Sequence, residues 1–164
     1  MEQNIFKVAI LGPESTGKSE LAAALAVHYK TAWAPEFARE YFRSRPGGYN
    51  REDVIKCVIG QRDLETKALQ TANRIVFFDT DMINFKVWLE DKYGDAPAWI
   101  TEDLKSRYDF YLLTYPDLPF VEDPLRENPE RRQFLFDCYS QETKAVEIPF
   151  SIIRGTGPDR LANA

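Results

Sequence analysis

The 164-residue sequence has few of the residues that metal centres, disulfide frameworks and membrane spans require. It contains two cysteines, Cys57 and Cys138, and one histidine, His28. Because the two thiols stand far apart and only one imidazole could join them, we expect neither a zinc site nor a disulfide framework. No apolar run approaches the roughly 20 residues of a membrane span, and the N-terminus lacks a signal-peptide pattern. A reducing cytoplasm is therefore the expected location, with no membrane partner.

Positive charge is also scarce. The chain has 21 Lys and Arg against 26 Asp and Glu, a formal net charge of −5. A protein that neutralises a nucleic-acid backbone needs a basic face, so we expect no nucleic-acid partner. A small nucleotide complexed with Mg²⁺ needs only a few well-placed cations. The length favours one domain over residues 1–164, and its oligomeric state is left open.

The most informative stretch is Gly-Pro-Glu-Ser-Thr-Gly-Lys-Ser at 12–19. It fits the phosphate-binding loop (Walker A) pattern of Gly, four residues, Gly-Lys, then Ser or Thr. An apolar run at 5–11 predicts a buried strand before it, and an Ala/Leu-rich segment at 19–29 predicts a helix after it. This order lets backbone N–H groups and a helix N-terminus converge on an anion. The alternative, a strand-to-helix turn that binds nothing, is disfavoured by both flanks.

The loop assigns roles at a predicted ATP site. Lys18 is expected to reach the β- and γ-phosphates and act in catalysis, and Ser19 to ligate Mg²⁺. The last predicted strand covers residues 149–153. We expect the turn that follows it to hold the adenine, with Arg160 flanking the adenine ring. The predicted nucleotide-binding residues are Gly12, Glu14, Ser15, Thr16, Gly17, Lys18, Ser19, Glu20, Gly155 and Arg160.

Two acids follow a second apolar run. Residues 75–78, Ile-Val-Phe-Phe, predict a buried strand with Asp79 at its carboxyl end. In a phosphate-loop protein such an acid indicates a Walker B carboxylate, so we expect Asp79 to hold Mg²⁺ with Ser19. Pairing of Asp79 with a nearby Arg is the alternative. Asp81 has two interpretations of equal weight: contact with the acceptor substrate, or N-cap of a helix at 82–93.

Glu36 and Arg39 form another charged pair. They follow Pro35 and share a face of the one or two helical turns predicted at 36–42. Ligands of open α/β sheets bind beyond the carboxyl ends of the strands, so both residues are predicted to bind the acceptor. Glu36 or Asp81 would act as general base, and the sequence does not choose between them. A solvated, salt-bridging turn is the alternative.

A loop at about 117–132 contains three prolines and three arginines and predicts a mobile lid. Arg126, Arg131 and Arg132 are predicted to act in catalysis by closing on the transferred phosphate, where one arginine is worth roughly 10³ to 10⁵ in rate. The alternative is a charged, solvated helix start. Three helix aromatics, Trp88, Tyr93 and Trp99, are further candidates for stacking on an acceptor ring, although such residues more often belong to a core.

The predicted fold is a three-layer α/β sandwich of the P-loop NTPase class, with a parallel sheet of about five strands flanked by helices. The chain resembles the ribosylnicotinamide kinase domain of the bacterial NadR proteins, a branch of the small phosphate-loop kinases. The similar blocks are Gly-Pro-Glu-Ser-Thr-Gly-Lys-Ser at 12–19, Glu-Phe-Ala-Arg-Glu at 36–40, Phe-Asp-Thr-Asp at 78–81, Asp-Phe-Tyr-Leu-Leu at 109–113, and Pro-Leu-Arg at 124–126 with Arg131 and Phe134.

The resemblance covers nearly the whole chain. It implies transfer of the γ-phosphate of ATP to the 5′-hydroxyl of nicotinamide riboside, giving nicotinamide mononucleotide for NAD biosynthesis. Two alternatives stay open. One is a kinase for another nucleoside or a nucleoside monophosphate, in which Arg39 would supply the extra cation. The other is an ATP-binding sensor without turnover, which the presence of Lys18, Ser19 and Asp79 disfavours.

Overall fold

Five strands form one parallel sheet with the order β2-β3-β1-β4-β5. The computed structural model describes residues 4–123 and 126–164. In these parts of the chain the strands are β1 (Phe6–Leu11), β2 (Trp33–Ala34), β3 (Ile75–Asp79), β4 (Phe110–Thr114) and β5 (Phe150–Ile153). The predicted sheet is confirmed, and the order places β1 in the centre with β3 and β4 beside it.

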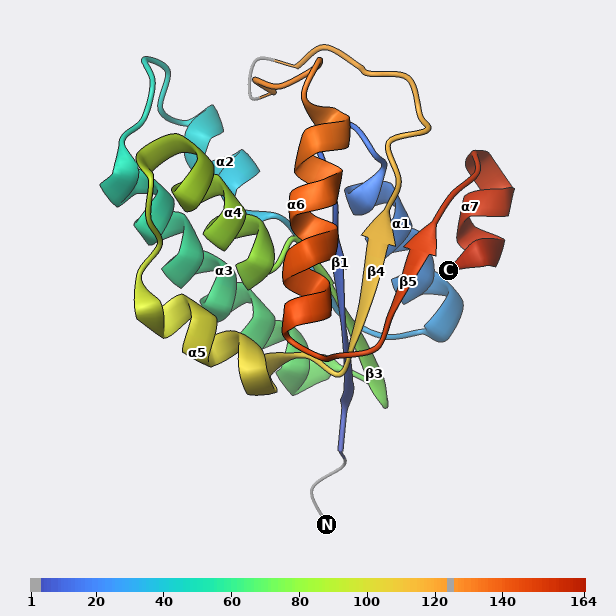
Figure 1. Ribbon diagram of the computed structural model, residues 1–164. Coiled ribbons are helices and arrows are strands. Elements are labelled where there is room, and N and C mark those ends of the chain that lie inside the picture. Colours follow the sequence, from blue (N-terminus) through green and yellow to red (C-terminus); the bar gives the residue numbers. More distant parts are fainter. Residues whose placement is uncertain (1–3, 124–125) are drawn as a thin grey trace.

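Helices cover both faces of the sheet (Figure 1). Those in the described parts of the chain are α1 (Lys18–Tyr29), α2 (Phe37–Arg43), α3 (Arg51–Thr71), α4 (Met82–Tyr93), α5 (Ala98–Arg107), α6 (Arg132–Ala145) and α7 (Gly157–Asn163). None of these described helices is long and apolar enough to cross a bilayer. The three-layer arrangement follows from the sheet, because parallel strands joined by crossover helices have both faces buried.

Alternate residues of β1 enter two separate cores. Val8 and Ile10 pack with α1 and α7, whereas Ala9 and Leu11 face the larger core formed with α2 to α6. This alternation is the two-residue period of a strand, with both faces apolar because both are covered. Residues that follow β1, β3 and β4 therefore emerge together at one edge of the sheet.

The turn after β1 passes very close to β4. A Cβ atom added to Gly12 would lie 2.2 Å from Thr114 Oγ1 and 2.8 Å from the Thr114 carbonyl oxygen, and Gly12 has a φ of +152°. No side chain fits there. Glycine at the first position of the phosphate loop thus lets the loop leave β1 against the end of β4.

Candidate active site

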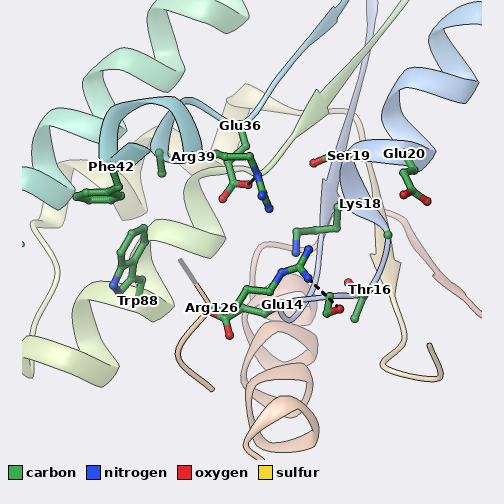
Figure 2. A pocket seen from close by; sticks show the side chains of 13 residues that line it. Glu14, Thr16, Lys18, Ser19, Glu20, Glu36, Arg39, Phe42, Trp88 and Arg126 are labelled. Atoms are coloured by element: carbon green, nitrogen blue, oxygen red, sulfur yellow. Dashed lines mark hydrogen bonds and ion pairs between the residues drawn. The ribbon is translucent and has the colours of Figure 1, made fainter. Parts of the chain in front are cut away.

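A cleft opens at the carboxyl ends of the strands. It consists of a smaller cavity of about 370 Å³ beside the phosphate loop and a larger cavity of about 970 Å³ beside α2 and α4. Figure 2 shows the side chains that line the smaller one. The two cavities share six lining residues, Glu14, Lys18, Glu36, Arg39, Phe42 and Trp88. They are therefore two ends of one continuous cleft.

The phosphate loop curves around the smaller cavity. Its backbone has positive φ at Ser15 (57°) and Gly17 (74°), which turns successive peptide groups toward the same side. The Thr16 hydroxyl donates to the Pro13 carbonyl at 2.7 Å and hydrogen-bonds Thr114 Oγ1 at 2.6 Å. No side chain from the described residues caps α1. The first turn of α1 and the loop thus form the type of site that binds phosphate.

Lys18 stands where the two cavities meet. Its ammonium donates to the carbonyls of Gly12 and Pro13, each at 2.8 Å. Burial lowers the pKa of Lys18, and the negative charges of Glu36, Asp79 and Glu14 oppose that shift. The cation is thus held close to the loop by two neutral acceptors, in a position shared by both ends of the cleft.

Ser19, which follows Lys18 in the chain, forms a hydrogen-bonded pair with Asp79. The Ser19 hydroxyl donates to Asp79 Oδ2, and Oδ1 of the same carboxyl is buried without a hydrogen-bond partner in the described chain. Burial and the nearby Glu36 raise the pKa of Asp79 to about 6, against the opposing effects of Ser19 and Lys18. A hydroxyl and an unpartnered carboxyl oxygen fit Mg²⁺, which takes one or two protein ligands and completes its shell with phosphate oxygens and water.

Glu36 and Arg39 face Lys18 from across the cleft (Figure 2). Glu36 immediately precedes α2, and its Oε2 lies 3.6 Å from Arg39 Nε. Arg39 also donates through Nη1 to Asp123 Oδ2 at 3.0 Å. The helical spacing predicted from the sequence brings the carboxylate and the guanidinium to the same side, on the wall shared by the two cavities.

Asp81, the other candidate base, does not lie on the wall of the cleft. Its side chain is fully buried, accepts a hydrogen bond from the Asn84 N–H at 2.9 Å and caps α4. The N-cap interpretation is confirmed. Asp81 is not among the lining residues of either cavity. Of the two candidate bases, the structure places Glu36 on the cleft and Asp81 beneath it, because capping α4 turns the Asp81 carboxyl inward.

The three lid arginines have different surroundings. Arg126 lines the smaller cavity near Lys18 and donates to Ser15 Oγ at 3.3 Å (Figure 2). Arg132 donates to the carbonyls of Ser15 and Leu118 at 3.1 and 2.8 Å. Arg131 is bound by both carboxyl oxygens of Asp91, at 2.8 and 2.7 Å. Of the three, only Arg126 lines the smaller cavity, whereas Arg131 lines the larger one and Arg132 lines neither.

The phosphate loop holds the lid through two side chains. The Glu14 carboxylate accepts the N–H groups of Glu127 and Asn128 at 3.1 and 2.9 Å. Ser15 Oγ accepts the Val121 N–H at 2.9 Å.

Glu20, another predicted nucleotide-binding residue, lines the smaller cavity. Pro124 and Leu125, which open the Pro-Leu-Arg block, lie outside the described residues.

Arg160 and Gly155 do not line either cavity. Arg160 is 5% exposed. The structure therefore does not present Arg160 to a ring in either cavity, and its contact with adenine stays a prediction. Its guanidinium donates instead to oxygen atoms behind the phosphate loop, including the Gly155 carbonyl at 2.7 Å.

An aromatic cluster at the far end of the cleft was missed in large part by the sequence analysis. The rings of Phe42, Tyr49 and Trp88 lie 4.8 to 5.9 Å apart between centroids and all line the larger cavity. Phe42 follows Glu36 and Arg39 at three-residue spacing on the same helix face, a pattern that could have identified it. Trp99 and Tyr93, the other predicted stacking candidates, do not line either cavity.

Tyr49 organises this cluster. Its hydroxyl accepts hydrogen bonds from Trp88 Nε1 at 3.1 Å and Lys92 Nζ at 2.7 Å, and donates to Glu127 at 2.9 Å. The loop that carries Tyr49 is thereby connected to α4 and to the lid. Burial and the adjacent Glu127 raise the pKa of Tyr49, so the phenol stays protonated and available as a donor.

Thr80 is a further residue of the larger cavity that the sequence did not identify. It lines the larger cavity directly after Asp79 and has a φ of 75°. Such a conformation is strained for a β-branched residue and is concentrated at functional sites. Thr80 Oγ1 and the nearby Asn84 Oδ1 are buried without hydrogen-bond partners in the part of the chain that is described. The floor of the larger cavity is therefore polar.

The parallel sheet, the phosphate loop after its central strand and the strand-end Asp79 define a small phosphate-loop (P-loop) kinase fold. The chain belongs to the family described as "AAA domain", whose model matches residues 7–160. It is homologous to the "Trifunctional NAD biosynthesis/regulator protein NadR" of Salmonella typhimurium strain LT2, with 32% identity over 124 residues. That match covers 73% of this chain and 30% of the relative, so the chain spans about a third of the relative's length.

Solved structures show the same fold. The structure of a NadR protein in complex with NR has a TM-score of 0.78 and 24% identity, and the match covers 96% of this chain and 48% of that one. Deoxyadenosine kinase from M. mycoides with bound dATP has a TM-score of 0.64 and 14% identity, with 96% and 95% of the two chains covered. The architecture is therefore shared between NadR and nucleoside kinases.

Proposed function

We propose that the chain is an ATP-dependent kinase that phosphorylates the 5′-hydroxyl of nicotinamide riboside to give nicotinamide mononucleotide in NAD salvage. The observation that carries the proposal is the continuous cleft, in which Lys18 and Glu36 line both cavities. A triphosphate in the smaller cavity and a nucleoside in the larger one would meet between these two side chains. Homology to NadR supports nicotinamide riboside as that nucleoside.

Catalysis in this arrangement is positioning and charge neutralisation. Lys18 and the loop N–H groups would hold the phosphates, with Arg126 beside the transferred group. Ser19 and Asp79 would hold Mg²⁺, which supplies neutralisation of the charge on the phosphate oxygens. Glu36 would orient the acceptor hydroxyl and accept its proton.

The charges of the larger cavity favour a nucleoside over a nucleoside monophosphate. Its cations other than Lys18 each have a carboxylate within 3.6 Å, in the pairs Arg39–Asp123, Arg43–Glu40, Arg45–Asp53, Lys92–Glu127 and Arg131–Asp91. An acceptor phosphate would have to displace one of these carboxylates. The pyridinium ring of nicotinamide riboside is instead a cation, and a ring face such as that of Phe42 or Trp88 attracts cations.

A coupled assay of ADP formation with several acceptors tests the function. We expect nicotinamide riboside to give the highest kcat/KM among nicotinamide riboside, thymidine, deoxyadenosine and the nucleoside monophosphates. No turnover with nicotinamide riboside would overturn the proposal. A different preferred nucleoside is the second candidate, since the Phe42–Trp88 rings can stack on any base. ATP binding without turnover of any acceptor would indicate a sensor.

Removing the Tyr49 hydroxyl tests the acceptor end of the cleft. We expect Tyr49→Phe to raise the KM for the acceptor about fivefold or more, because Trp88 and Glu127 lose a hydrogen bond worth about 1 kcal/mol. The KM for MgATP should stay unchanged. Steady-state kinetics with each substrate varied in turn measure both values. Tyr29→Phe, on the exposed side of α1, is the matched control, and an equal rise in both KM values would contradict the assignment.

A further inference from the structure

Arg160 is buried directly behind the phosphate loop. Its Nη2 donates to the carbonyls of Thr16 and Tyr115, at 2.9 and 2.8 Å. Its Nη1 donates to Asp117 Oδ1 and to the Gly155 carbonyl, both at 2.7 Å. One side chain on the short helix α7 thus joins the phosphate loop, the end of β4 and the turn after β5. An arginine fork is suited to this, because it presents several donors in a fixed plane.

The contact with Thr16 determines how the next peptide group points. In a trans peptide the C=O of one residue and the N–H of the following residue point in opposite directions, and no cis peptide occurs in the described chain. When Arg160 holds the Thr16 carbonyl on the α7 side, the Gly17 N–H must point away from α7. Thr16, Gly17 and Lys18 line the smaller cavity, so we infer that the Gly17 N–H faces this cavity.

The same segment is held on its other side. The Thr16 hydroxyl bonds to Pro13 and Thr114, so that side chain and carbonyl of one residue are both fixed. A Cβ atom added to Gly17 would lie 3.2 Å from Leu118 and 3.8 Å from Arg160 Nε, which shows how closely the lid and the guanidinium approach this point. The loop is therefore held in its curved shape by protein atoms alone.

Asp117 in turn orients Arg160. Its Oδ1 accepts from the guanidinium and its Oδ2 accepts the Gly155 N–H at 2.8 Å. Burial acts to raise the pKa of Asp117, but these two hydrogen-bond donors outweigh it and lower the pKa. The carboxylate therefore stays ionised, and Arg160 has a charged partner that directs its other donors to the three carbonyls.

We propose that Arg160 is a positioning residue of the nucleotide site: through the Thr16 carbonyl it sets the phosphate loop in its anion-binding shape before the nucleotide arrives. Asp117 is its orienting partner. The inference rests on nucleotide binding at the loop and is independent of the acceptor. It also gives α7 a function, since α7 brings Arg160 to the loop from the opposite end of the chain.

Binding of two ligands distinguishes this role from contact with adenine. Affinities for MgATP and for inorganic tripolyphosphate with Mg²⁺ are measured by titration calorimetry on the full chain. For Arg160→Met we expect both affinities to fall by the same factor, about tenfold or more, because both ligands need the loop N–H groups. Arg160→Lys keeps the charge but loses the fork, so it should fall between wild type and Arg160→Met. Asp117→Asn should weaken both ligands by a common, smaller factor.

Asp159→Asn is the matched control. Asp159 lies on the same helix, is exposed, and its side chain makes no hydrogen bond or ion pair among the described contacts. It should leave both affinities unchanged. Weaker MgATP with unchanged tripolyphosphate would make Arg160 an adenine contact and overturn the inference. Variants that melt at lower temperature yet bind both ligands as wild type would also overturn it. Turnover is not measured, so failure of the nicotinamide riboside proposal would not change this result.

Discussion

A Lys18→Met variant is expected to transfer phosphate about a thousandfold more slowly than wild type. The ammonium belongs to the phosphate loop and lines both cavities, and it is partly buried, where a charge acts strongly on developing negative charge. Methionine preserves most of the volume but cannot neutralise the phosphate oxygens. The measurement is kcat at saturating MgATP and acceptor, with the affinity for MgADP determined by calorimetry.

Lys67→Met is the control for this change. Lys67 is exposed on α3, away from the residues that line the cleft. It should leave kcat within about twofold of wild type, as surface substitutions usually do. If Lys18→Met kept a tenth or more of the wild-type kcat, the ammonium would not be the principal phosphate ligand. The smaller cavity would then have to bind something other than the triphosphate.

The parts of the site that the sequence predicted are those whose chemistry is local in the chain. Gly12 to Ser19 form the loop through their own backbone, and Asp79 is recognisable because an acid directly follows an apolar strand. The neighbouring strands β1 and β3 then bring Asp79 to Ser19, as the parallel order requires. Periodicity was also sufficient for the strands and helices, with differences of a few residues at their ends.

The parts that could not be predicted depend on partners distant in the sequence. Arg131 looks like a lid arginine by position, but Asp91 binds it from α4, and nothing in the sequence links the two. Arg160 follows a turn that suggested an adenine contact, yet its acceptors include carbonyls of the phosphate loop and of Tyr115, the residue after β4. A long cationic side chain can reach many carbonyls, and only the fold selects which.

Backbone strain could not be predicted from the sequence either. Thr80 has a left-handed conformation that a β-branched residue rarely takes, and no sequence pattern at this position indicates it. Its consequence is that the chain turns sharply between the metal-binding candidate Asp79 and the N-cap Asp81. This turn is why two acids only two residues apart differ in their contacts: Asp79 accepts a hydrogen bond from Ser19, whereas Asp81 is buried as a helix cap. Glu36 is therefore the residue that we propose as the base.

That choice gives the second large expected effect. Glu36→Gln should lower kcat about a hundredfold or more, because the amide keeps the shape of the side chain but cannot accept the acceptor proton. MgATP binding should change little, since Glu36 makes no hydrogen bond to the phosphate loop among the described contacts. Asp81→Asn should leave kcat within a few-fold of wild type, because asparagine caps a helix as well as aspartate does.

Glu40→Gln is the matched control on the same helix: Glu40 is exposed and pairs only with Arg43 among the described residues, so kcat should not change. The three variants together decide the base. A large loss of kcat in Asp81→Asn with little loss in Glu36→Gln would reverse the assignment, and would require the α4 cap to open when the acceptor binds. A loss in Glu36→Gln that appears only as a higher KM for the acceptor would make Glu36 a binding residue. A loss in kcat at saturating substrates, with MgATP affinity preserved, is the pattern that a proton acceptor between the two cavities produces.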